Sequence, residues 1–274
     1  MCKSSYICRL YTSMNEQTNM EQPSTADILA EVERRRTQAR RPQNDDRRRL
    51  IIAADRAVFW LSKHWLAVLN TLAILYVGFP VLAPVLAYLG IEGPAHVIYT
   101  IYRPLCNQLP QRSWFLFGHK LAYDVAELMA SIGLDAQANQ LSNILAIETL
   151  IGPGNEVLGY KVALCQRCTA IYGSILFFGL LFALLRHRVR PLHWVAYVLL
   201  GLVPMAIDGG YQWLSYAIDW FFPSLLVAAH ETTPLLRTIT GALFGLATIW
   251  LAYPHVQEAM DEFRENLHER FGWQ

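Results

Sequence analysis

The chain has 274 residues, of which 54% are hydrophobic and 16% are charged, and its mean hydropathy is +0.23. A chain this apolar and this poor in charge is not typical of a soluble domain, so we expect an integral membrane protein. The formal net charge of +1 excludes little, because basic residues concentrate in the first 63 positions, in runs such as Arg34-Arg35-Arg36.

Residues 1–63 form the first predicted region, a basic and largely disordered cytoplasmic arm that is rich in polar residues and poor in aromatic ones. One short helix is predicted near residues 25–41, capped by Ser24 or Thr25. The arm contains no apolar core followed by a small-residue cleavage site, so no cleavable signal peptide is expected. We favour attraction of the arm to anionic lipid head groups over a nucleic-acid or protein partner.

Residues 64–253 form the predicted membrane domain. About 20 apolar residues cross the hydrocarbon core of a bilayer. The segments that fit this length are 65–89, 162–185, 192–207 and 234–253. The stretch 213–229 is interrupted by Asp219 and Pro223, so we expect a partly embedded or interfacial helix there. A polar amphipathic cytoplasmic tail, 254–274, follows.

The segment 91–161 is the longest between two predicted spans. Its part Cys106–Gly118 is too polar to cross a bilayer and too aromatic for a solvated linker, so a re-entrant or interfacial element is expected. Residues 121–151 fit one or two amphipathic helices. The predicted fold class is therefore all-α, a polytopic membrane helix bundle of about four transmembrane helices plus re-entrant or interfacial helices on the outer face.

The distribution of Lys and Arg predicts the orientation. With four spans, 17 of these residues lie on the side that holds both termini and 6 on the other side. The positive-inside rule then makes both termini cytoplasmic, in the cell inner (plasma) membrane. Four polar clusters that are far apart in the sequence are consequently expected on the outer face: the Cys106 segment, the start of the Cys165 helix, Asp208, and residues 230–237.

Thiols are the most conspicuous chemistry on that outer face. The chain has five cysteines, and an odd number argues against the fully paired framework of a secreted protein. Cys165, Cys168 and Tyr172 would share one face of a helix that begins near residue 162. Cys106 belongs to the same side of the membrane, so we predict that it lies close to Cys165 and Cys168.

Four sequence patterns occur in order. They are Cys106–Gly118, Cys165–Gly173, Asp208–Gln212, and Thr232 or Thr233 through Arg237 to Gly241. In these the chain resembles an uncharacterised membrane protein family catalogued as domain of unknown function 2085, over roughly residues 95–248. The resemblance implies no established activity. Asn107 stands where the family usually has a histidine. If that histidine is a metal ligand in the relatives, this chain must use another residue in its place or bind the metal differently.

Three thiols invite a metal interpretation. Zinc in a closed site takes four Cys or His ligands. We assign Cys106, Cys165, Cys168 and His119 as candidate ligands, with His96, His230 or Asp208 as alternatives to His119. Two other interpretations stay open. Outside the cytoplasm Cys165 could form a disulfide with Cys168 or Cys106, and all three residues could be small packed side chains.

Polar residues near the thiols form a second candidate set, either around the metal site or binding an anion. They are Arg112, Arg167, Tyr172, Asp208, Gln212, Glu231 and Arg237. Guanidinium groups hold phosphate or carboxylate with paired donors, but ion pairs with the nearby acids are the simpler account. Arg167 in particular is predicted to pair with Asp208, Asp219 or Glu231.

The sequence supports three functions and names no reaction. The first is a thiol-based metal or redox site at the extracytoplasmic face, with zinc as the cofactor or else a disulfide without a cofactor. The second is a non-catalytic structural or assembly subunit, and the third is a lipid-head-group-binding or transport protein. The expected partners are membrane lipid and other membrane subunits. The pair Gly241 and Gly245 is expected to report helix packing within the protein.

Overall fold

The computed structural model describes residues 24–39, 45–133, 147–186, 188–222 and 230–271. They fall into two compact units, Met1–Ala57 and Val58–Gln274. In the first unit α2 (Thr25–Ala39) confirms the predicted short helix, and the hydroxyl of Ser24 accepts a hydrogen bond from the backbone of Ala26 at 3.2 Å. The arm of residues 1–63 was expected to be largely disordered, but residues 45–63 belong to a long helix; residues 1–23 and 40–44 lie outside the described residues.

Among the described residues, four helical segments are long and apolar enough to cross a membrane: Arg49–Tyr88, Gln166–Leu185, Trp194–Phe221 and Pro234–Glu269. They belong to α3 (Asp45–Tyr88), α7 (Gln166–Leu185), α8 (Trp194–Tyr197) with the π-helix η2 (Val198–Leu202) and α9 (Val203–Phe221), and α10 (Pro234–Phe271). The predicted all-α membrane bundle is confirmed. One boundary was wrong, because the third helical segment continues to Phe221 where a separate interfacial piece was expected.

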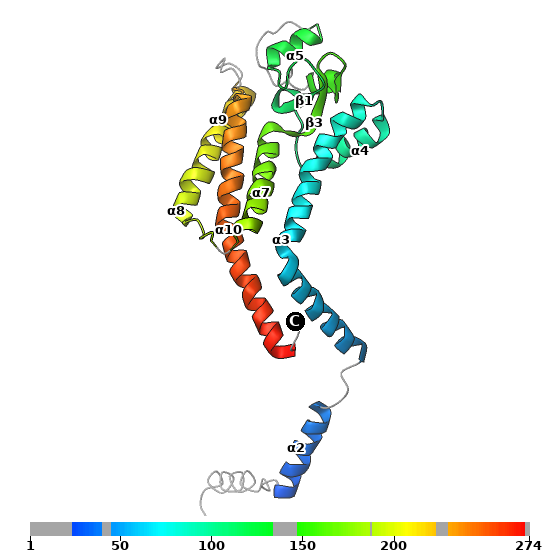
Figure 1. The fold of residues 1–274 in the computed structure, drawn as a ribbon, viewed down its shortest axis with the longest axis vertical. Coiled ribbons are helices and arrows are strands. Elements are labelled where there is room, and N and C mark those ends of the chain that lie inside the picture. Colours follow the sequence, from blue (N-terminus) through cyan, green and yellow to red (C-terminus); the bar gives the residue numbers. More distant parts are fainter. Residues whose placement is uncertain (1–23, 40–44, 134–146, 187, 223–229, 272–274) are drawn as a thin grey trace, which may run out of the picture. The chain divides into compact units, whose positions relative to one another are not determined.

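Helices α7 and α10 pack side by side along most of the length of α7 (Figure 1). Glycines on α10 allow the close approach: a Cβ on Gly245 would lie 2.2 Å from the Ser174 hydroxyl, and one on Gly241 would lie 2.7 Å from the Arg167 carbonyl oxygen. Trp65 of α3 packs against the same pair of helices. Its ring centroid lies 5.3 Å from that of Tyr253 and 6.3 Å from that of Phe182.

A small antiparallel sheet was missed by the sequence analysis. It has the order β1-β3-β2 and consists of β1 (Ser113–Leu116), β2 (Gly154–Asn155) and β3 (Gly159–Cys165). The expected re-entrant or interfacial element at 106–118 therefore contains a strand, and the segment 162–165 is a strand and not the start of a helix. A short continuous apolar run fits a buried strand as well as a buried helix, and residues 162–164 are such a run.

Short elements complete the part of the chain around the sheet. They are α4 (Glu92–Tyr102), the 3-10 turn η1 (Pro110–Arg112) and α5 (Val125–Ser131). A reciprocal capping box of Asp124 and Glu127 starts α5. Phe115 of β1 and Leu128 of α5 are fully buried in one apolar cluster, so the sheet and α5 share a core.

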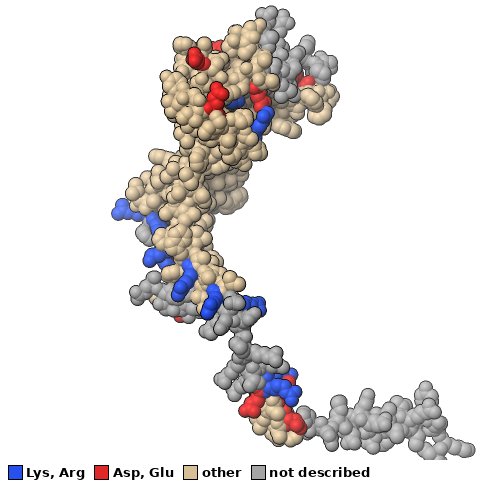
Figure 2. Space-filling model, turned by 90° about the vertical axis from the view of Figure 1, so that its right-hand side faces the viewer, with Lys and Arg blue, Asp and Glu red and all other residues tan. Residues whose placement is uncertain are grey.

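The surface of the second unit has the distribution of charged and apolar side chains that is expected of a membrane protein. On the face drawn in Figure 2, a broad region with little charge lies between a lower group of Lys and Arg and an upper group in which Asp and Glu lie beside Lys or Arg. Large apolar side chains of the long helices are exposed, among them Leu72, Leu180 and Leu199. Such a surface fits contact with lipid.

The glycine contacts give the first testable prediction. Gly245→Ala should lower the melting temperature in detergent, at a cost of about 1–3 kcal/mol, because the new methyl group would lie 2.4 Å from the backbone carbonyl oxygen of Ile171. Gly173→Ala on α7 is the matched control, since nothing lies within 4 Å of a Cβ at that position. Equal melting temperatures of the two variants would contradict the α7–α10 contact.

Candidate functional site

Three thiols come together where the sheet meets the membrane helices. The sulfurs of Cys106, Cys165 and Cys168 all lie within 4.8 Å of one another, and all three residues are free cysteines. The predicted proximity of Cys106 is confirmed. The predicted shared helix face is wrong for Cys165, which ends β3 and caps α7. Its sulfur accepts a hydrogen bond from the Cys168 backbone at 3.5 Å, so the two thiols still lie together.

Strand pairing brings Cys106 to this junction across 59 residues of sequence. Cys106 extends the end of α4 and donates its backbone N–H to the Tyr102 carbonyl at 2.9 Å. A few residues later Ser113 of β1 pairs with Cys165 of β3. As a result the backbone N–H of Cys165 points at the Cys106 sulfur, 3.3 Å away.

The hydrogen bonds to sulfur favour a thiolate at one position. The thiols of Cys106 and Cys168 hydrogen-bond to the Cys165 sulfur and, together with the Cys168 backbone N–H, lower the pKa of Cys165 to about 2. The bond with Cys165 raises the pKa of Cys106 above its usual value. The thiolate form is the one that binds metals, so Cys165 is the residue best prepared to act as a ligand.

Apolar and aromatic side chains enclose the thiols. Tyr102, Val162 and Leu164 pack around Cys106 in one buried cluster. Tyr172, one turn beyond Cys168 on α7, contacts Tyr76 of α3 with ring centroids 4.4 Å apart. The structure thus places Tyr172 against α3, and the ring that it contacts, Tyr76, packs against the cluster that holds the thiols.

The structure does not bring His119 to the sulfurs. The group of described side chains that could hold a metal contains the three cysteines alone. His119 is exposed beyond the far end of β1, whose residues from Ser113 onward carry the chain roughly 10 Å from the Cys165 pairing. The alternatives His96 and His230 are also exposed, and Asp208 is engaged by Arg167.

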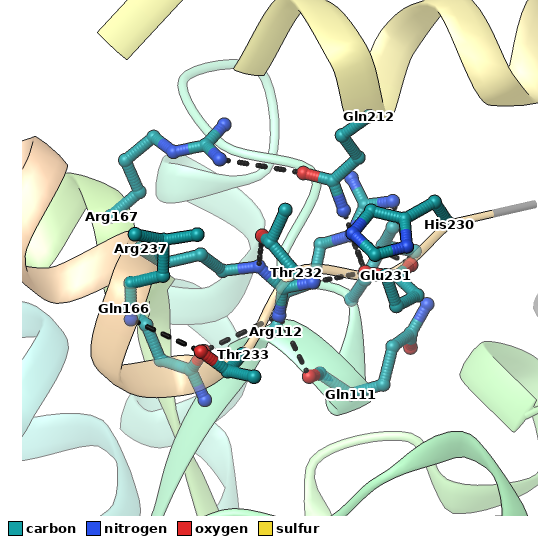
Figure 3. A network of polar contacts seen from close by, with 12 residues as sticks. Gln111, Arg112, Gln166, Arg167, Gln212, His230, Glu231, Thr232, Thr233 and Arg237 are labelled. Carbon is teal, nitrogen blue, oxygen red and sulfur yellow. Dashed lines mark hydrogen bonds and ion pairs between the residues drawn. The ribbon is translucent and has the colours of Figure 1, made fainter. Parts of the chain in front are cut away.

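A buried ionic network lies beside the thiols, with Glu231 at its centre (Figure 3). Arg112 binds this carboxylate with two nitrogens, Nε at 3.1 Å from both oxygens and Nη2 at 2.7 Å from Oε1. Arg237 and Tyr216 also donate to Glu231, and the Gln212 amide does so at 2.6 Å. Two arginines from different elements therefore share one acid.

The second ion pair of the network joins Arg167 to Asp208, as predicted. Gln212 accepts from Arg167 at 3.4 Å and so links this pair to Glu231. Thr240 of α10 donates to Asp208 at 3.0 Å. The side chain of Asp208 is 2% exposed and that of Arg167 is 20% exposed, so the acid is buried and the arginine keeps some contact with water.

Two glutamines that the sequence analysis missed connect this network to the sheet. Arg237 donates to the Gln111 carbonyl at 3.2 Å and to the Gln166 side chain at 3.4 Å. Gln166, which is fully buried, donates in turn to the Ser113 carbonyl at 3.1 Å. Both glutamines stand beside residues that were singled out, and an amide at the start of an apolar span was a usable signal.

Charge balance explains the protonation of the network. Burial alone would raise the pKa of Glu231, but the hydrogen bonds and positive charge of Arg112, with the charge of Arg237, outweigh it and hold the pKa below its usual value. Burial would also lower the pKa of Arg112, and Glu231 reverses this effect and raises it. Both groups are therefore charged at neutral pH.

Removal of the central acid gives the second prediction. Glu231→Gln should cost about 3–5 kcal/mol, because the buried Arg237 and the partly buried Arg112 lose their counter-charge. Glu258→Gln is the control, since Glu258 is 72% exposed in its pair with His255 and should change stability by no more than about 0.5 kcal/mol. Denaturation in detergent measures both, and equal losses would contradict the assigned role.

The pH dependence of stability, compared between wild type and Glu231→Gln, provides an independent check. Because folding lowers the pKa of Glu231 from the ordinary 4.5, its stabilisation is complete above that pH and is lost as the pH falls through the folded value. Wild type should thus lose more stability than Glu231→Gln between about pH 5 and pH 3. Parallel acid curves would show that Glu231 is not held ionised.

The sequence of the chain is similar to that of known proteins over the region that contains most of this site. The profile of a family described as predicted membrane protein (DUF2085) matches residues 156–251, which include the Cys165, Asp208 and Arg237 patterns. The uncharacterized protein MJ1492 of Methanocaldococcus jannaschii is 26% identical over 202 residues, covering 71% of this chain and 93% of that protein. No solved structure matches. The resemblance to this uncharacterised membrane protein family is thus confirmed over residues 156–251.

Proposed function

We propose that this membrane protein binds a transition-metal ion through Cys106, Cys165 and Cys168 at the extracytoplasmic face. One observation carries the proposal: three sulfurs from two distant parts of the chain converge within 4.8 Å. A tetrahedral zinc with bonds of about 2.3 Å holds its sulfurs about 3.8 Å apart, so the sulfurs need to move by no more than about 1 Å. Thiolates are ligands typical of zinc and copper(I).

The donor set favours an open site over a closed structural one. No described His, Asp or Glu joins the three sulfurs, so the residues present supply three ligands. Three protein ligands leave a position for water or a small ligand, as in catalytic and exchanging zinc sites. The three sulfurs would hold the metal, and the backbone N–H groups of Cys165 and Cys168 would offset the negative charge of the thiolates.

The neighbouring arginines are better explained as structural partners than as an anion clamp. Arg112 and Arg237 both bind Glu231, and Arg167 binds Asp208. These pairs lock α7, α9 and α10 to the turn that precedes β1. The proposal of a structural subunit therefore explains the arginines, whereas it gives no reason for three thiols at one point.

The third prediction concerns metal content. Protein purified in detergent should contain about one equivalent of zinc or copper, and Cys168→Ser should lower this at least about tenfold. The matched control replaces the two remaining cysteines, Cys2→Ser and Cys8→Ser, and should keep the metal. Elemental analysis and intact mass with thiol alkylation measure the outcome. Metal-free protein with three free thiols would contradict the proposal, and a disulfide would favour the redox alternative.

The fourth prediction concerns orientation. We propose the inner membrane with both termini cytoplasmic, because Arg186, Arg188 and Arg190 follow the end of α7 that lies opposite the thiols. In intact cells an impermeant maleimide should label His119→Cys and leave Arg188→Cys unmodified, as read by peptide mass spectrometry. The reverse labelling pattern would show the opposite orientation in the membrane, with the thiols on the cytoplasmic side.

A further inference from the structure

A cavity lies next to the thiol site and is separate from it. It measures about 440 Å³ and is bounded by α4, the residues after Cys106, residues 148–153 and β3. Its polar lining includes His96, Tyr99, Arg103, Gln108, Glu148 and Lys161. The volume is large enough for a small polar ligand together with several waters, each of which occupies about 30 Å³ in the liquid.

Lys161 is the unusual member of this lining. It is only 5% exposed, although lysine is almost never buried without a partner of opposite charge. Its ammonium donates to the Gln108 carbonyl at 2.8 Å, and no described carboxylate lies within ion-pair distance of it. An ammonium has three donors, so two can serve a ligand in the cavity.

The charged side chains around the cavity carry more positive than negative charge. Glu148 is the acid of the lining, and it pairs with Arg103 at 3.3 Å. The side chain of Arg103 is 73% exposed, which places this pair toward water while Lys161 is buried. Burial lowers the pKa of Lys161 to about 8, so the ammonium is still protonated at neutral pH. The cavity therefore has an excess of positive charge.

A ring of hydrogen bonds fixes the position of Lys161. Gln108 adopts a φ of 52°, which is uncommon for a residue other than glycine, and this conformation directs its carbonyl to the ammonium. Its side-chain amide donates to the Tyr99 carbonyl at 2.9 Å. The Tyr99 hydroxyl donates to the Lys161 carbonyl at 2.5 Å and closes the ring. Lys161 is thus held in the cavity and cannot extend to bulk water.

We propose that this cavity binds a phosphate group, with Lys161 as the buried cation and Arg103 as a second cation at its exposed side. A phosphate oxygen would accept from the free donors of the ammonium, in the way that lysine binds phosphate elsewhere. Free inorganic phosphate and the head group of an acidic phospholipid present the same chemistry. The proposal is independent of the metal site, because none of the three sulfurs lines the cavity.

The fifth prediction tests this site with purified full-length protein in detergent. Inorganic phosphate, added at constant ionic strength against chloride, should raise the melting temperature of wild type. Lys161→Met should weaken phosphate binding at least about tenfold, and Lys161→Arg should retain part of it. Lys120→Met is the matched control, because Lys120 is exposed in its pair with Glu127 and lies outside the cavity.

A second arm identifies the source of the phosphate. Nanodiscs of phosphatidylglycerol and of phosphatidylcholine replace the free ion, and a Lys161-dependent preference for phosphatidylglycerol alone would assign the site to a lipid head group. If Lys161→Met does not fold, acylation of Lys161 in wild type replaces it, and phosphate or phosphatidylglycerol should protect that amine. Binding unchanged in Lys161→Met, or no binding and no protection by either source, would overturn the proposal.

Discussion

The packing of the sheet against the membrane helices depends on the ion pairs of the Glu231 carboxylate. This carboxylate accepts hydrogen bonds from two arginines on different elements, Arg112 in the turn η1 that precedes β1 and Arg237 on α10. Charges in a weakly polar interior are costly unless they are paired, so neither arginine can stay where it is without this acid. The sheet and the membrane helices are thereby held in one register, since Glu231 accepts from both at once.

The thiol site depends on that register through Gln166. Arg237 binds the side chain of Gln166, which binds the backbone of Ser113, and Ser113 pairs with Cys165. Cys106 reaches Cys165 only because this strand pairing places the end of α4 beside β3. A substitution in the ionic network should therefore alter the sulfur positions although no arginine of the network has a hydrogen bond to a cysteine among the described contacts.

The sequence predicted those features that follow from length, hydropathy and charge. The four spans, the pairing of Arg167 with Asp208 and the convergence of Cys106 with the other thiols belong to this group. The sheet was missed because residues 162–164 are buried on all sides, so the alternation that marks a strand is absent. Lys161 was missed because its environment is built from residues far away in the sequence, and no local pattern reports such a contact.

The direct junction between β3 and α7 has a mechanical consequence. Strand and helix follow one another without a loop at Cys165, and the sulfur of that residue is bonded to the first turn of the helix. Because no loop separates the strand from the helix, a change in the spacing of the three sulfurs must rotate the first residues of α7 relative to the sheet. At Gly241 and Gly245 helices α7 and α10 are in close contact, so α7 cannot rotate without displacing α10. A change in the spacing of the sulfurs would therefore be transmitted to α10.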